Sequence, residues 1–196
     1  MKQGIAFLGL NGAGKSTLAH ELAKRINYFE MDVEDYYFPE QKLSRIYALD
    51  NKMGIETQYL GSLPFTKPRE KSKVQEMLLK DIKKNARFIL SGVSINWEPE
   101  ICSFIKIAFL IETPLSVRLK RIEQREKLRF GKRVNPGGDM YLQQQEFLKT
   151  VAARDFKSVE KSAEKLSCSV IKLDGKLPIN ENIEKIINCL DATKSL

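Results

Sequence analysis

Short apolar runs alternate along the chain with longer stretches in which apolar residues recur at helical spacing. The runs have the length of β-strands, and they are Ile5 to Leu8, Tyr28 to Met31, Phe88 to Leu90, Ile107 to Ile111 and Val170 to Leu173. This alternation is typical of α/β proteins, and continuous apolar runs are typical of strands buried on both faces of a parallel sheet. The pattern therefore predicts a five-stranded, mostly parallel sheet with helices on both faces.

Between the runs, apolar residues spaced three and four apart predict amphipathic helices. One is expected near Glu70 to Asn85, with the apolar positions Val74, Met77, Leu78 and Ile82. Thr113 and Pro114 place a capping hydroxyl before a proline, which predicts a helix start after the fourth run. The last helix is expected to begin near Asn180, and its apolar positions are Ile183, Ile186, Ile187 and Leu190.

The composition narrows the function only slightly. The length of 196 residues suits one domain, expected over residues 1–196, and the net charge of +8 suits nucleic acid, anionic lipid or polyphosphate. No apolar run approaches the length of a membrane span, and the first one leads into glycines and not into a cleavage site, so we expect a cytoplasmic protein. The cysteines lack metal-ligand spacing and are expected to be reduced thiols: Cys102, Cys168 and Cys189. Nothing in the pattern indicates an oligomeric state.

A glycine-rich motif directly follows the first run. The segment Gly9-Leu10-Asn11-Gly12-Ala13-Gly14-Lys15-Ser16-Thr17 matches the P-loop (Walker A) pattern G-x-x-x-x-G-K-[ST]. Glycines let the backbone turn several N–H groups toward one point, and the helix that follows presents its N-terminal amides and dipole to the same point. Lys15 is expected to reach the β- and γ-phosphates, and the Ser16 hydroxyl is expected to coordinate Mg²⁺. The nucleotide-binding residues predicted from the motif are Gly9, Asn11, Gly12, Ala13, Gly14, Lys15, Ser16 and Thr17.

Together with three further segments, this loop resembles the adenylate-kinase-like group of P-loop kinases, which includes nucleoside-monophosphate, shikimate and gluconate kinases. The segments are Asp32-Val33-Glu34-Asp35 after the second run, Arg121-Ile122-Glu123-Gln124-Arg125 after the fourth, and Leu173-Asp174-Gly175 with Pro178 after the fifth. The resemblance covers nearly the whole chain. It implies the P-loop NTPase fold, ATP and Mg²⁺ as cofactors, and transfer of the γ-phosphoryl group to a small-molecule or nucleotide acceptor.

The resemblance also implies roles for single residues. Ser16 and Asp32 would bind the metal, with Glu34 or Asp35 as a further ligand left open. Asp32 would also act on the acceptor hydroxyl, with Asp35 as the second choice. Glu34 and Asp35 join Asp32 as candidate acceptor-binding residues. The basic and turn residues are assigned as follows: Arg121 to the nucleotide, Arg125 and Arg133 with Lys15 to catalysis, and Asp174 and Gly175 to the adenine.

Two segments interrupt the α/β alternation. Residues 36–73 contain several glycines and prolines and are expected to bind the acceptor, and residues 127–139 form a basic insert that is expected to be a lid. The lid ends in Asn135-Pro136-Gly137-Gly138, a strong turn signal, after which Asp139 is expected to cap one long helix. The apolar positions of this helix are Phe147, Val151, Val159 and Leu166.

The resemblance has gaps that leave alternatives open. No Walker B aspartate follows the third run, at Leu90 to Ser94, and the substrate signatures of adenylate, shikimate and gluconate kinases are not intact, so the acceptor is not identified. A regulatory GTPase is disfavoured because the chain lacks N-K-x-D and D-x-x-G. A nucleic-acid-binding ATPase is disfavoured because no DNA- or RNA-binding module is recognised. A nucleotide sensor without kinase activity stays open.

Overall fold

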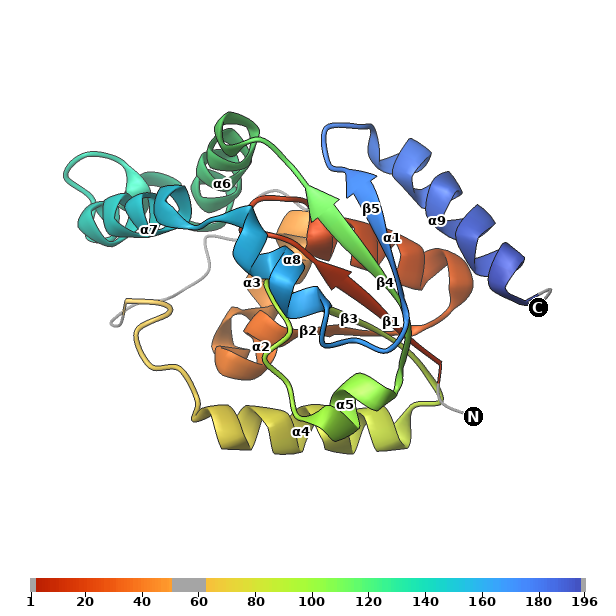
Figure 1. Ribbon diagram of the computed structural model, residues 1–196. Coiled ribbons are helices and arrows are strands. Elements are labelled where there is room, and N and C mark those ends of the chain that lie inside the picture. Colours follow the sequence, from red (N-terminus) through yellow and green to blue (C-terminus); the bar gives the residue numbers. More distant parts are fainter. Residues whose placement is uncertain (1–2, 51–62, 195–196) are drawn as a thin grey trace.

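A computed structural model of the chain describes residues 3–50 and 63–194, and within them five strands form one sheet (Figure 1). The strand order is β2-β3-β1-β4-β5, and every neighbouring pair is parallel. The strands are β1 (Gln3–Leu8), β2 (Phe29–Asp32), β3 (Arg87–Gly92), β4 (Ile105–Glu112) and β5 (Ser169–Asp174). The prediction of five strands is confirmed, and the sheet is entirely parallel.

Helices cover both faces of this sheet and bury two separate cores. Successive residues of β1 alternate between them, so that Ile5 and Phe7 lie in one core while Ala6 and Leu8 lie in the other. The first core is closed by α1 (Lys15–Ile26) and α9 (Ile179–Lys194). The second is closed by α4 (Lys71–Lys84), α5 (Pro99–Ser103) and α8 (Phe156–Ala163).

The remaining helices gather at the carboxyl ends of the strands. The chain leaves β2 through α2 (Val33–Tyr37), the 3₁₀ turn η1 (Pro39–Gln41) and α3 (Lys42–Leu49). It leaves β4 through α6 (Leu115–Phe130), η2 (Gly131–Val134) and α7 (Tyr141–Ala153), and α6 and α7 lie to one side of the sheet (Figure 1). Ligand sites of open parallel sheets lie at this edge, beyond the carboxyl ends of the strands.

Three local predictions about helix ends were wrong. Pro114, and not Thr113, is the N-cap of α6, because the Thr113 hydroxyl donates to the Ala13 carbonyl at 3.2 Å. Asp139 caps no helix, because its carboxylate forms a bidentate ion pair with Arg133 and accepts hydrogen bonds from the guanidinium at 2.9 and 2.7 Å. The single long helix expected after it is two helices, α7 and α8, and Asp155 caps the second by accepting from the Lys157 N–H at 3.0 Å. Thr113 and Asp139 therefore each have a partner other than the helix end that they were expected to cap.

Within the described ranges, no helix combines the length and the apolar character that a membrane crossing requires. Cys102, Cys168 and Cys189 are free.

Candidate active site

A cleft of about 1150 Å³ opens at the carboxyl edge of the sheet. Its floor is the glycine-rich loop between β1 and α1, and its walls come from α2, α3, α4, α6, α8, the loop after β3 and the start of α9. The segments that follow β1, β2, β3, β4 and β5, whether loops or helices, therefore all contribute to one cavity, as the fold class predicts.

The glycine-rich loop is shaped by backbone that only glycine adopts without strain. Gly12 and Gly14 have positive φ angles of 79° and 105°, and a Cβ on Gly12 would lie 2.5 Å from the Arg118 carbonyl oxygen. Gly14 is the N-cap of α1, and no side chain caps this helix end. The first N–H groups of α1 therefore face the cleft side of the loop without a side-chain acceptor, which is the arrangement that binds phosphate.

Lys15 is buried at the start of α1. Its Nζ atom donates to the Leu10 carbonyl at 3.1 Å, so the side chain curls back over the loop. Burial lowers the pKa of Lys15 to about 8, and nearby Asp32 and Glu34 oppose this decrease. A phosphate group would supply the negative charge that this partly desolvated ammonium lacks.

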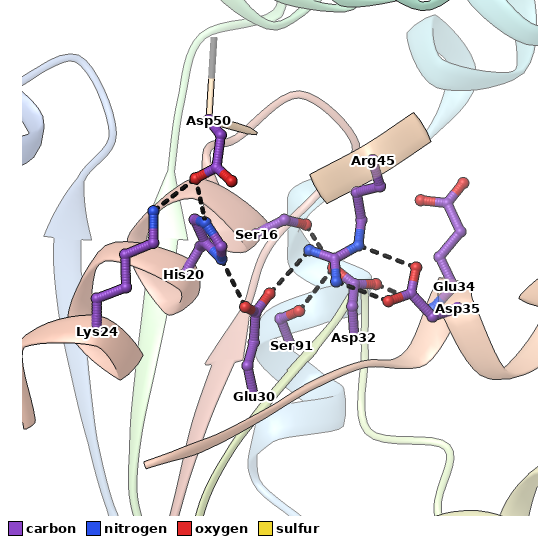
Figure 2. Close-up of polar contacts among 10 residues, drawn as sticks. All are labelled: Ser16, His20, Lys24, Glu30, Asp32, Glu34, Asp35, Arg45, Asp50 and Ser91. Carbon is purple, nitrogen blue, oxygen red and sulfur yellow. Dashed lines mark hydrogen bonds and ion pairs between the residues drawn. The ribbon is translucent and has the colours of Figure 1, made fainter. Parts of the chain in front are cut away.

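Asp32 ends β2 and is saturated with donors. Its Oδ2 atom accepts from the Ser16 hydroxyl at 2.6 Å and from the Ser91 hydroxyl at 2.9 Å, and its Oδ1 atom accepts from the Glu34 N–H at 3.0 Å (Figure 2). Burial opposes ionisation of Asp32, but Arg45 and these donors together hold its pKa below the ordinary value. The carboxylate is thus ionised, fixed and directed at Ser16.

Ser91 lies near the place where the Walker B aspartate of many P-loop proteins is missing from this chain. It stands at the carboxyl end of β3, where a Walker B aspartate was expected, and it donates to Asp32 from the neighbouring strand. The acidic group of the site therefore comes from β2, with a hydroxyl from β3 holding it. The sequence offered no signal for Ser91, because a serine at a strand end has no motif of its own.

Glu34 and Asp35 differ although they are adjacent. Glu34 lines the cleft, and no side chain of residues 3–50 and 63–194 donates to its carboxylate; burial raises its pKa while Arg125 opposes the increase. Asp35 instead accepts both arms of Arg45, at 2.9 and 2.6 Å, and it does not line the cleft (Figure 2). Of the three candidate acceptor-binding carboxylates, the structure brings Asp32 and Glu34 into the cleft.

The predicted arginines also differ in whether they line the cleft. Arg121 lines the cleft and donates to the Ala13 carbonyl at 3.4 Å, and Arg125 lines it with an ion pair to Glu126 at 2.5 Å. Arg133 lies outside the cleft and pairs with Asp139 at 2.7 Å. Gly175 borders the cleft and Asp174 does not; the Asp174 carboxylate accepts from the Lys176 N–H at 2.8 Å and so shapes the turn.

Sequence reasoning missed Arg154. This residue lies between α7 and α8, borders the cleft, and donates to the side-chain oxygen of Asn11 in the glycine-rich loop. The two residues are 143 positions apart in the chain, so no local pattern connects them. The sequence signal that could have identified Arg154 is the break in helical spacing at Arg154 and Asp155, because it places a basic side chain at the junction of two helices.

The acceptor and lid segments meet at Arg129. Its guanidinium donates to the Ser44 hydroxyl at 3.0 Å and lies 5.1 Å from the ring centres of both Phe65 and Phe130. Ser44 and Phe65 belong to the predicted acceptor segment, of which residues 51–62 lie outside the described ranges. Motion of the 127–139 segment as a lid stays a prediction.

Comparisons with known proteins agree with this architecture. The family described as AAA domain matches residues 5–135. An uncharacterized protein of Bacillus subtilis (strain 168), YqaC, is 28% identical over 200 residues, which cover 98% of this chain and 99% of that protein.

Solved structures are similar over nearly the whole chain. Shikimate kinase from Aquifex aeolicus vf5 aligns with a TM-score of 0.51 and 19% identity, covering 97% of this chain and 98% of that one. Deoxyadenosine kinase from M. mycoides aligns with a TM-score of 0.52 and 19% identity, covering 96% and 99%. Shikimate kinase from Acinetobacter baumannii aligns with a TM-score of 0.52 and 15% identity, covering 99% and 96%. The fold expected from the sequence, that of P-loop kinases, is confirmed.

Proposed function

The chain belongs to the AAA domain family, and we propose that it is a phosphotransferase that moves the γ-phosphoryl group of ATP to a small-molecule or nucleotide acceptor. The observation that carries this proposal is the position of Glu34. A partly buried carboxylate, to which no side chain of the described residues donates, borders the same cleft as the glycine-rich loop, and Lys15 is close enough to influence it electrostatically. The kinase names of the similar solved structures support the same reaction class.

The residues at the floor of the cleft fit a magnesium ion. Ser16 and Asp32 present only oxygen atoms, 2.6 Å apart, and Mg²⁺ prefers few protein ligands, completed by phosphate oxygens and water. When bound, the ion would neutralise charge on the β- and γ-phosphates. Ser16 and Asp32 would hold it, and Ser91 would keep Asp32 oriented through its hydroxyl.

We assign the proton acceptor to Glu34 and not to Asp32. Asp32 accepts three hydrogen bonds and has a lowered pKa, so it is a weak base and a good metal ligand. Glu34 has a raised pKa and a carboxylate that accepts no hydrogen bond from a described side chain, which suits it to orient an acceptor hydroxyl and take its proton. Asp35, the second choice from the sequence, would hold Arg45 in place.

Positive side chains would neutralise the transferring phosphoryl group. Lys15 and Arg125 border the cleft and both lie near Glu34, as their mutual electrostatic influence indicates. Preorganised charges of this kind stabilise the transition state without reorganising during the reaction. Arg133 could join them only if the lid segment moved, because it is paired with Asp139 outside the cleft.

The proposal is tested by ADP formation from Mg²⁺-ATP against a panel of nucleotides, nucleosides, sugars and cyclic hydroxy acids. We expect at least one acceptor to raise ADP formation far above the acceptor-free rate, with transfer of the γ-phosphoryl group confirmed by mass spectrometry of the product. Tight ATP binding that no acceptor converts into ADP formation would contradict the proposal and favour the nucleotide sensor.

A further inference from the structure

Glu126, on α6, is a buried carboxylate to which the proposed reaction assigns no part. The residue is 4% exposed and, unlike Arg125 before it, does not line the cleft. A carboxylate removed from water costs free energy unless cations or donors compensate it. Two arginines do so, because Oε1 of Glu126 accepts from Nε of Arg125 at 2.6 Å and lies 3.6 Å from Nη1 of Arg129. The charge of Glu126 is therefore held next to an arginine of the cleft wall.

The contact between Arg125 and Glu126 differs from an ordinary pair on a helix surface. Side chains at neighbouring positions of an α-helix point about 100° apart and do not face each other. Yet Nε and Nη2 of Arg125 lie 2.6 and 2.5 Å from the same oxygen of Glu126. The Arg125 side chain must therefore bend back along the helix to reach Glu126, and this bend sets the direction of its guanidinium.

The contact uses only one edge of the guanidinium. A guanidinium carries five N–H groups in a fixed planar fork, and Glu126 occupies the edge formed by Nε and Nη2. Nη1 of Arg125 donates to no group in residues 3–50 and 63–194. Because Arg125 lines the cleft, the edge formed by Nη1 and the second N–H of Nη2 is available to a ligand there. Two parallel donors of this kind match two oxygen atoms of a phosphoryl group.

A second carboxylate competes for the same cation. Glu34 also lines the cleft and lies near enough to Arg125 for each to shift the pKa of the other. Burial opposes the charge of Arg125, but Glu126 and Glu34 together raise its pKa above the ordinary value. Of the two carboxylates, Glu126 is the one that accepts a hydrogen bond from Arg125. Glu126 thus keeps Arg125 from pairing with Glu34, the residue that we assign as proton acceptor.

We propose that Glu126 is a positioning residue for phosphoryl transfer, which holds Arg125 so that the Nη1 edge of its guanidinium faces the γ-phosphoryl group of ATP. This role rests on the proposed function, since it takes the cleft as the site where the nucleotide binds. Glu126 acts through Arg125, because it does not itself line the cleft. Its removal should therefore affect nucleotide binding only while Arg125 is present.

Calorimetry with Mg²⁺-ATP and Mg²⁺-ADP tests this role without any acceptor, because the two probes differ only in the γ-phosphoryl group. We expect Arg125→Ala to lower the ratio of ATP to ADP affinity by roughly tenfold or more, as for a lost charge-assisted hydrogen bond. Glu126→Ala should lower the ratio by roughly threefold to tenfold, within the range of coupling between residues in contact. The double variant should match Arg125→Ala, because no guanidinium is then left to position.

Glu123→Ala is the matched control, since Glu123 is exposed on the same helix and does not line the cleft. It should leave the ratio of ATP to ADP affinity unchanged. Glu126→Gln keeps the size and one acceptor oxygen but loses the charge, so it should retain more of the ratio than Glu126→Ala. Should Glu126→Ala fail to fold, as judged by circular dichroism, Glu126→Gln takes its place in the comparison with the double variant.

Two outcomes would overturn the role of Glu126. One is a loss of stability in Glu126→Ala with an unchanged ratio of ATP to ADP affinity, which is what a merely structural residue would give. The other is an equal loss of the ratio in the presence and in the absence of Arg125. The expected pattern without transfer to any acceptor would instead contradict the phosphotransferase and leave the positioning role of Glu126 standing.

Discussion

The two ends of the cleft are built by different means. The proposed phosphate end consists of one contiguous loop whose backbone would do the binding, with positive glycine φ angles and a helix start without a side-chain cap. The acceptor end consists of side chains from α2, α3, α4 and α6, held by ion pairs and ring contacts across the chain. A site built from backbone is local in sequence and insensitive to most side-chain changes, whereas a site built from side chains depends on each partner.

Arg45 is the centre of the acceptor end. Its guanidinium binds Asp35 with both arms and Glu30 at 2.8 Å, and Glu30 in turn contacts Nδ1 of His20 at 2.6 Å (Figure 2). His20 lies on α1, the helix that begins with Lys15, and its other ring nitrogen lies 3.1 Å from Asp50 at the end of α3. The network therefore fixes the acceptor end to the helix that carries the phosphate end.

Replacing Arg45 should have the largest effect on stability. Arg45→Met leaves Asp35 buried without its cation and removes one partner of half-buried Glu30, and breaking a buried pair typically costs about 3–5 kcal/mol. Urea denaturation would measure the loss, with Lys24→Met as the control, because its pair with Asp50 is half-exposed and should matter little. Similar stabilities for the two variants would break the contrast between the ends.

Replacing Lys15 should affect turnover and spare stability. Lys15→Ala removes a cation from the phosphate end, and loss of one preorganised donor lowers kcat by about a hundredfold to a thousandfold. The Lys15 pKa of about 8 lies below the ordinary 10.5, so the unfolded chain binds more protons between those values and wild-type stability rises with pH there. The variant should lack this rise in thermal melts, and exposed Lys24→Ala on the same helix should keep normal turnover.

Replacing Glu34 should lower kcat by about a hundredfold, the lower range for a general base. The raised pKa of Glu34 means that wild-type activity falls as pH decreases through that value, whereas Glu34→Gln should show no such step. Stability has the opposite trend, because the folded state binds the extra proton; wild-type stability decreases as pH rises above the ordinary 4.5, and the variant should not follow. Glu40→Gln, exposed in η1, is the control, and a pH step retained in Glu34→Gln would remove its role.

The sequence predicted the backbone-built parts well and the side-chain-built parts poorly. Apolar runs gave all five strands, and the glycine motif predicted the loop, because both depend on residues that are neighbours in the chain. Thr113 illustrates where prediction from local sequence fails. Its hydroxyl was expected to cap a helix, but it donates to the carbonyl of Ala13, which lies 100 positions away in the chain. Arg45 and Arg154 escaped notice for the same reason, since their partners are defined only by the tertiary structure.

The strand order has a consequence for folding of the chain during its synthesis on the ribosome. β1 is the middle strand of the sheet, yet it is the first to be synthesised, and both of its partners, β3 and β4, come much later. About eighty residues separate β1 from β3, so at typical synthesis rates its apolar residues wait on the order of 4–16 seconds for the first partner strand. During that interval the apolar residues of β1, directly before the glycine-rich loop, have no partner strand to pair with.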